Sequence, residues 1–155
     1  MKTILIPVDF SAATRTVVAH AITVARSLSA RLVVLNVIPP PVVIAEYGAL
    51  VENVVQLTDA GEKASARQLA QLALRFERRV ITVSVMRRTG SPGPYIIEVA
   101  ERVRAAYIVM GAHGYTAFFD LLVGNNTHGV LRRSKCPVLV VPPEQSKAKR
   151  ATRFL

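Results

Sequence analysis

The most specific pattern of this sequence lies in residues 107–142, YIVMGAHGYTAFFDLLVGNNTHGVLRRSKCPVLVVP. It begins with an apolar run of strand length, Tyr107 to Met110, and ends with a second such run, Cys136 to Val141. Between the two runs, the residues after Gly124 recur at helical spacing. A strand, a glycine-containing loop, a helix and a second strand in this order predict a unit with two parallel strands.

Three glycines of this stretch stand between the first strand and the helix. Gly111 and Gly114 come directly after the strand, with His113 between them, and nine residues separate Gly114 from Gly124. Glycine lets backbone N–H groups approach an anion closely, and the N-terminus of a helix adds a positive partial charge. The pattern therefore predicts a phosphate-binding loop.

The rest of the chain alternates strand and helix patterns in the same way. This order predicts an α/β fold, a three-layer doubly wound sheet of five parallel strands with helices on both faces. The helical pattern that begins near Leu50 fits either one helix or two. The other expected elements are a strand at Thr3–Val8, a helix capped by Ser11 and ending at Leu28, a strand at Arg31–Ile38, the helical stretch ending near Arg78, a strand at Val80–Met86, and a helix after the turn at Gly90–Pro94.

Length and composition indicate one folded domain. The chain has 155 residues, of which 51% are apolar, and this suffices for a buried core. We expect the domain to cover residues 1–143, with residues 144–155 as a flexible basic tail. No apolar run reaches the roughly 20 residues of a membrane span, and the single Cys136 fits a reducing compartment. The sequence therefore predicts a cytoplasmic protein without membrane contact.

The formal net charge of +10 raises the question of a nucleic-acid partner. Four of the basic residues lie in the tail after the last strand, and most others stand where solvated helix ends and strand edges are expected. This placement favours a solvated surface with a loose tail over a dedicated nucleic-acid face. Binding through the tail stays open as the lesser alternative.

Two strand ends carry the candidate functional residues. Ligands of doubly wound sheets bind at the carboxyl ends of the strands, where the strand order reverses. Pro7, Val8 and Asp9 close the first strand, and Gly111 follows the fourth. If these strands are neighbours, both loops line one cleft, where the Asp9 carboxylate can accept a hydrogen bond from a ligand. We therefore expect a small-molecule site there.

The glycine pattern resembles a family motif. Gly111-x2-Gly114-x9-Gly124 followed by polar residues is similar to the G-x2-G-x9-G-[ST] motif of the ATP-binding branch of the universal stress proteins. The opening ILIPVDFSAATRTVVAHAITVA, residues 4–25, resembles the first strand and helix of that family, and CPVLVVP, residues 136–142, resembles its closing strand. The likeness spans roughly Lys2 to Pro142.

The resemblance implies a flavodoxin-like or Rossmann-like fold related to the adenine nucleotide alpha hydrolases. It also implies a stress-response protein that binds ATP, ADP or AMP, with Mg or Mn carried by the phosphates, and that forms a homodimer through its last strand. The implied nucleotide-binding residues are Pro7, Val8, Asp9 and Val37 for adenine, Met110, Gly111, His113 and Gly114 for ribose and phosphates, and Gly124, Asn125, Asn126 and Thr127 for the outer phosphates.

Two residues depart from the family pattern. Asn125 stands where the motif has Ser or Thr, and Asp120 lies in a loop, Tyr115–Val123, that has no Lys or Arg. A bulkier amide and a carboxylate near the outer phosphates predict weaker affinity or a preference shifted from ATP toward ADP or AMP. The same departures leave open an alternative protein of the same fold, with an empty cleft, that acts as a dimeric interaction protein.

No catalytic constellation is visible in the sequence. It contains no nucleophile elbow and no Walker motif, and its three histidines lack metal-ligand spacing. We therefore expect a binding protein, with slow ATP hydrolysis as the alternative activity and no metal site built by the protein. Simpler structural roles also stay open: Asp9 could cap the first helix, and His113 could bond only to backbone.

Overall fold

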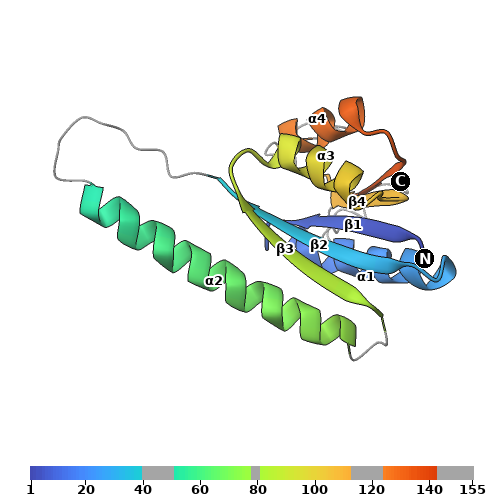
Figure 1. Ribbon diagram of the computed structural model, residues 1–155, viewed down its shortest axis with the longest axis horizontal. Helices are drawn as coiled ribbons and strands as arrows, with labels where there is room; N and C mark the ends of the chain where they lie inside the picture. The colour runs from blue at the N-terminus through green and yellow to red at the C-terminus, as the bar shows by residue number, and fades with distance from the viewer. Residues whose placement is uncertain (40–50, 78–80, 113–123, 143–155) are drawn as a thin grey trace, which may run out of the picture.

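The computed structural model describes residues 1–39, 51–77, 81–112 and 124–142. The elements alternate along the chain, as the sequence predicts (Figure 1). None of the described helices is both long enough and apolar enough to cross a membrane. The elements are β1 (Thr3–Val8), α1 (Ala13–Ser27), β2 (Arg31–Ile38), α2 (Val51–Glu77), β3 (Val83–Thr89), α3 (Pro92–Arg102), β4 (Tyr107–Gly111), α4 (Asn125–Arg133) and β5 (Val138–Val141).

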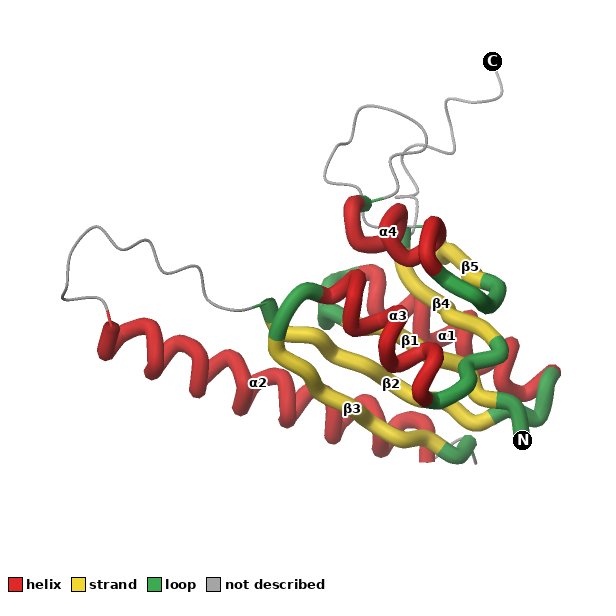
Figure 2. The backbone as a smooth tube through the Cα atoms, turned by 45° about the horizontal axis from the view of Figure 1, so that its top comes forward, coloured by secondary structure: helices red, strands yellow, loops and turns green. Residues whose placement is uncertain are grey.

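The strands form one parallel sheet in the order β3-β2-β1-β4-β5. Helices α1 and α2 cover one face, and α3 and α4 cover the other, so that the molecule has three layers (Figures 1 and 2). From β1 the chain continues to one side of the sheet, and from β4 it continues to the other. The strand order therefore reverses between β1 and β4, and the doubly wound architecture is confirmed.

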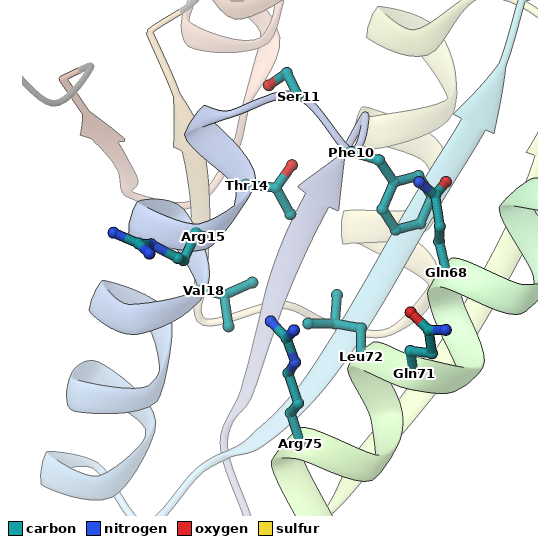
Figure 3. A pocket seen from close by; sticks show the side chains of 9 residues that line it. All are labelled: Phe10, Ser11, Thr14, Arg15, Val18, Gln68, Gln71, Leu72 and Arg75. Atoms are coloured by element: carbon teal, nitrogen blue, oxygen red, sulfur yellow. The ribbon is translucent and has the colours of Figure 1, made fainter.

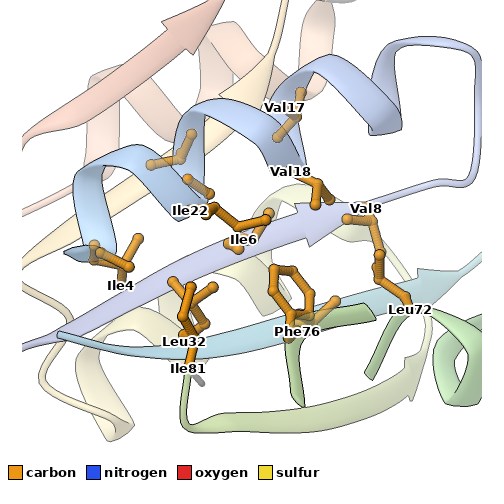
Figure 4. Packing of buried hydrophobic residues seen from close by; sticks show 14 of the residues in the cluster. Ile4, Ile6, Val8, Val17, Val18, Ile22, Leu32, Leu72, Phe76 and Ile81 are labelled. Carbon is orange, nitrogen blue, oxygen red and sulfur yellow. The ribbon is translucent and has the colours of Figure 1, made fainter. Parts of the chain in front are cut away.

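The core lies on both faces of β1 and β2. Ile4, Ile6 and Val8 pack toward α1 and α2, where Phe76 of α2 is fully buried (Figure 4). Leu5 packs in the opposite layer, with residues of α3 and α4. Because successive side chains of a strand point to opposite faces, only an unbroken apolar run can fill both layers. This explains why the predicted bounds of β1 and β2 agree with the structure.

Strand β3 differs from its prediction. It begins at Val83, three residues later than expected, and pairs with β2 from Val83 opposite Leu32 to Thr89 opposite Ile38. This strand lies at the edge of the sheet, where polar residues can continue the ladder. The apolar Ile81 is buried before the strand begins. The apolar pattern therefore marked burial here, and not the strand itself.

Helix boundaries also refine the predictions. The stretch from Val51 to Glu77 is one helix, which decides between the two alternatives. The predicted cap at Ser11 is wrong, because Ala12 occupies the N-cap position of α1 and makes no side-chain capping bond. Helix α3 begins at Pro92, inside the predicted turn, since proline is well suited to the first position of a helix.

Gly90 joins the ends of two strands to α3. Its φ is +144°, and its N–H donates a 2.8 Å hydrogen bond to the carbonyl of Ile38 at the end of β2. A Cβ at this position would lie 2.5 Å from Cε2 of Tyr95. Both the backbone conformation and the neighbouring ring require glycine here.

Candidate functional site

The structure brings the two predicted strand ends together. Strands β1 and β4 are parallel neighbours, with Ile4 opposite Tyr107 and Leu5 opposite Ile108. Their carboxyl ends, at Val8 and Gly111, lie at the same edge of the sheet. This edge is the point of strand-order reversal, where doubly wound sheets bind ligands.

Asp9 is exposed directly after β1. Its Oδ1 accepts a 3.0 Å hydrogen bond from the N–H of Ser11 and a 3.4 Å bond from the hydroxyl of Thr14. The carboxylate thus orders the turn that precedes α1, and neither bond is to a backbone N–H of the helix. A carboxylate has about four acceptor sites, so this role is compatible with a ligand contact.

A buried polar network from β2 and α2 holds the end of β1 in place. Asn36 of β2 is 5% exposed, and its Nδ2 donates a 2.8 Å hydrogen bond to the carbonyl of Val8. Its Oδ1 accepts a 2.6 Å bond from the hydroxyl of Ser65, which is 6% exposed on α2. Neither residue is among those predicted from the sequence. The one asparagine inside the apolar run RLVVLNVI could have indicated such a network, because a buried polar side chain needs a hydrogen-bond partner.

The end of β4 is tied to its two neighbours. The N–H of Ala112 donates a 2.9 Å hydrogen bond to the carbonyl of Val141 in β5. The hydroxyl of Thr127 in α4 donates a 3.0 Å bond to the carbonyl of Gly111. Thr127 is only 2% exposed, so its side chain serves this contact. The first turn of α4 is therefore held against the end of β4.

The N-terminus of α4 has backbone donors that the helix itself does not pair. Gly124 is the N-cap residue, and its carbonyl accepts the first intrahelical bond, from the N–H of His128. The N–H groups of Asn125, Asn126 and Thr127 precede that bond and have no acceptor inside the helix. The N-cap residue Gly124 has no side chain that could cap them, and the first turn contains no acidic residue. This end of the helix is therefore electropositive.

Helix α3 places a second N-terminus close to that of α4. A Cβ built on Gly93, in the first turn of α3, would lie 3.9 Å from Oδ1 of Asn126. Asn125 and Asn126 are both exposed at this edge. Each helix N-terminus carries roughly half a positive charge, and the two add where their first turns meet. An anion is the chemical group that this arrangement can hold.

The remaining predicted residues are placed as follows. Pro7 and Val37 are half-buried at the ends of β1 and β2, and Met110 is 5% exposed in β4. His113 and Gly114 lie outside the described residues, as does the loop that contains Asp120. Within the described ranges, no three His, Cys, Asp or Glu side chains gather in a way that could hold a metal ion.

A five-stranded parallel sheet with helices on both faces and a polar edge at the strand-order reversal defines the Rossmann-like class of α/β proteins. Within this class, the universal stress protein family model matches residues 1–142. The chain belongs to the universal stress protein family.

Similar proteins agree with this family membership. Universal stress protein MJ0531 of Methanocaldococcus jannaschii is 30% identical over 142 residues, which cover 90% of this chain and 81% of that protein. The solved structure of protein MJ0577, from the same organism, has a TM-score of 0.81 at 26% identity, with 94% of this chain and 98% of that chain covered. Universal stress protein UspA from Lactobacillus plantarum has a TM-score of 0.75 at 26% identity, with 90% and 97% covered.

One further structure of the same fold was solved with a ligand. It is a universal stress protein in complex with cAMP, with a TM-score of 0.68 at 22% identity, and the similarity covers 91% of this chain and 96% of that one.

Proposed function

We propose that this protein binds an adenine nucleotide at the carboxyl ends of β1 and β4. The observation that carries the proposal is the hydrogen bond between Thr127 and Gly111, which holds the N-terminus of α4, with glycine at its N-cap, beside the end of β4. Phosphate groups bind at such helix ends because the N–H groups and the helix dipole both favour negative charge. The N–H groups of residues 125–127 are the proposed donors to the phosphates.

The base and ribose lie toward β1 and β2 in this proposal. Pro7 and Val37 offer half-buried surface at the two strand ends, and Asp9 offers carboxylate oxygens to an amino or hydroxyl group. The hydrogen bond from Asn36 to Val8 keeps this strand end in place. The complex of a structurally similar family member with cAMP supports an adenine nucleotide as the ligand class.

A divalent ion, Mg or Mn, would be carried by the phosphates. The described residues contribute no cluster of metal-binding side chains, and Asn125 and Asn126 are the exposed polar side chains beside the α4 N-terminus. These amides would donate to phosphate oxygens or accept from water around the ion. This protein would then recognise the charge of the nucleotide mainly through backbone N–H groups.

The proposed working form is a cytoplasmic homodimer that joins through β5 and uses nucleotide occupancy as a signal in the stress response. Strand β5 lies at one edge of the sheet, and its Leu139 is 39% exposed. An apolar edge strand is protected when a second copy covers it. The opposite edge strand, β3, carries Arg87 and Arg88, charged side chains that disfavour such pairing.

Isothermal titration calorimetry with ATP, ADP and AMP tests the nucleotide proposal. Each titration is run with and without magnesium, and we expect saturable binding of at least one of the three nucleotides. Guanosine nucleotides serve as the control for base recognition at the β1 and β2 ends. An absence of heat and of competition with all three adenine nucleotides, up to millimolar concentration, would favour the interaction protein with an empty cleft.

A further inference from the structure

A hollow of about 260 Å³ lies between α1 and α2, on the sheet face that those two helices cover (Figure 3). Val18 and Leu72 form its apolar floor, and the ring of Phe10 points into it from the loop after β1. Gln68 and Arg75 project from the α2 side. The hollow is thus apolar at the bottom and polar along one wall.

The polar wall is not needed for packing against the sheet. Leu69 and Phe76 of α2 are buried in the core, whereas Gln68, Gln71 and Arg75 are exposed. These three recur at helical spacing on the side of α2 that turns toward α1. Residues between two helices on one sheet face are ordinarily apolar and fill the seam. Here long polar side chains border an open space.

Arg75 brings a positive charge to the hollow. Arg75 extends its guanidinium into the space between the helices, and within the described ranges no carboxylate pairs with it. Arg15 lines the α1 side and extends away from the centre. The Asp9 carboxylate bonds to Ser11 and Thr14, which line the rim of the hollow. Among the described residues that line the hollow, none is acidic.

We propose that this hollow is a second binding site, for a small organic anion that carries one ring. The ring would rest against Phe10 and Leu72, and its carboxylate or phosphate would meet the planar guanidinium of Arg75. The amides of Gln68 and Gln71 add donors along the same wall. Since pockets for drug-sized ligands begin at about 300 Å³, a single-ring compound matches the available space.

The binding test follows the methyl signals of Val18 and Leu72 by NMR while three probes are added. Benzoate and phenyl phosphate carry the two candidate anions, and benzyl alcohol is the neutral control. We expect saturable shifts with at least one anion, and affinity roughly ten times weaker for the alcohol. The anion that binds more tightly shows whether the site prefers a carboxylate or a phosphate group. Equal affinity for the alcohol, or no saturable shift with either anion at millimolar concentration, would overturn the proposal.

Two variants of α2 test the role of charge. Arg75→Gln keeps a long polar side chain but removes the guanidinium, and we expect roughly tenfold weaker anion binding. Arg67→Gln, at an exposed position that does not line the hollow, is the matched control and should bind like wild type. Equal affinity in both variants would contradict the assignment.

Competition with a nucleotide separates this site from the proposed nucleotide site. Saturating AMP should leave the benzoate-induced shifts unchanged, because neither α4 nor the proposed base-binding residues Pro7, Asp9 and Val37 line the hollow. Displacement of benzoate by AMP would overturn the proposal of a second site. A protein that binds benzoate but no nucleotide would refute the proposed function and leave the second site intact.

Discussion

The hydroxyl of Thr127 donates a 3.0 Å hydrogen bond to the carbonyl of Gly111, and this bond joins the first turn of α4 to the end of β4. Gly111 ends β4, and Thr127 lies in the first turn of α4. The contact is buried, with Thr127 only 2% exposed. A hydrogen bond within the protein therefore sets the geometry of the proposed phosphate site.

Removal of this hydroxyl should cost both stability and nucleotide affinity. Thr127→Val keeps the shape of the side chain but withdraws a buried hydrogen-bond donor, so we expect a loss of about 1–3 kcal/mol in the free energy of unfolding. Thr127→Ser keeps the hydroxyl and should lose only about 1 kcal/mol through its missing methyl group. Urea denaturation and nucleotide titration measure the two effects. A valine variant that matches wild type in both would contradict this role.

The network behind β1 gives a second prediction. Ser65→Ala leaves Oδ1 of Asn36 without its described donor inside the core, and we expect a loss of about 1–3 kcal/mol in stability. The control is Thr23→Ala, which removes an exposed hydroxyl bonded to its own helix and should change stability by less than about 0.5 kcal/mol. Chemical denaturation compares the two, and similar losses would contradict a special role for the buried pair.

Two glycine-to-alanine substitutions should change the stability of the protein in opposite directions. Gly90→Ala forces a side chain into a φ of +144° and against Tyr95, so we expect a loss of about 1–3 kcal/mol. Gly61→Ala lies in the middle of α2 with no atom within 4 Å of the new Cβ. It should stabilise the protein by about 0.5–1 kcal/mol through helix propensity. Thermal melts decide the signs, and a destabilised Gly61 variant would contradict the described environment.

A negative charge at the N-cap of α4 should weaken nucleotide binding without lowering the stability of the protein. Gly124→Asp and Gly124→Asn both place a capping side chain at an extended backbone position, φ −57° and ψ 156°, and both should preserve or raise the melting temperature. Only the aspartate repels phosphates, by about 1 kcal/mol or more at 4 Å. We expect roughly tenfold weaker ATP binding for the aspartate variant than for the asparagine variant. Equal affinities would place the phosphates elsewhere.

The sequence predicts the elements that are buried on both faces better than those at the edges. The bounds of β1 and β2 agree with the structure because each needs an unbroken apolar run. Strand β3 has one open edge and accepts polar residues, so its apolar pattern misplaced its start by three residues. Local patterns hold less information where a strand has one neighbour instead of two.

The candidate site shows the same division. The residues after β1 and β4 could be selected from the sequence because glycine and aspartate at strand ends have recognisable chemistry. The adjacency of these strands is a tertiary property, which the sequence left as a condition and the structure shows. Thr127 is implied by the family resemblance as a residue at the outer phosphates, and the structure adds that its hydroxyl donates to the carbonyl of Gly111. A side-chain direction of this kind follows from packing, which no local pattern encodes.

Amide chemical shifts during an ATP titration test the proposed nucleotide site. We expect the N–H signals of Asn125, Asn126 and Thr127 to move together with that of Asp9, with one common dissociation constant. This result would place the phosphates at α4 and the rest of the nucleotide at the end of β1. ATP binding that leaves the three α4 amides unmoved, or that moves only residues between α1 and α2, would contradict it.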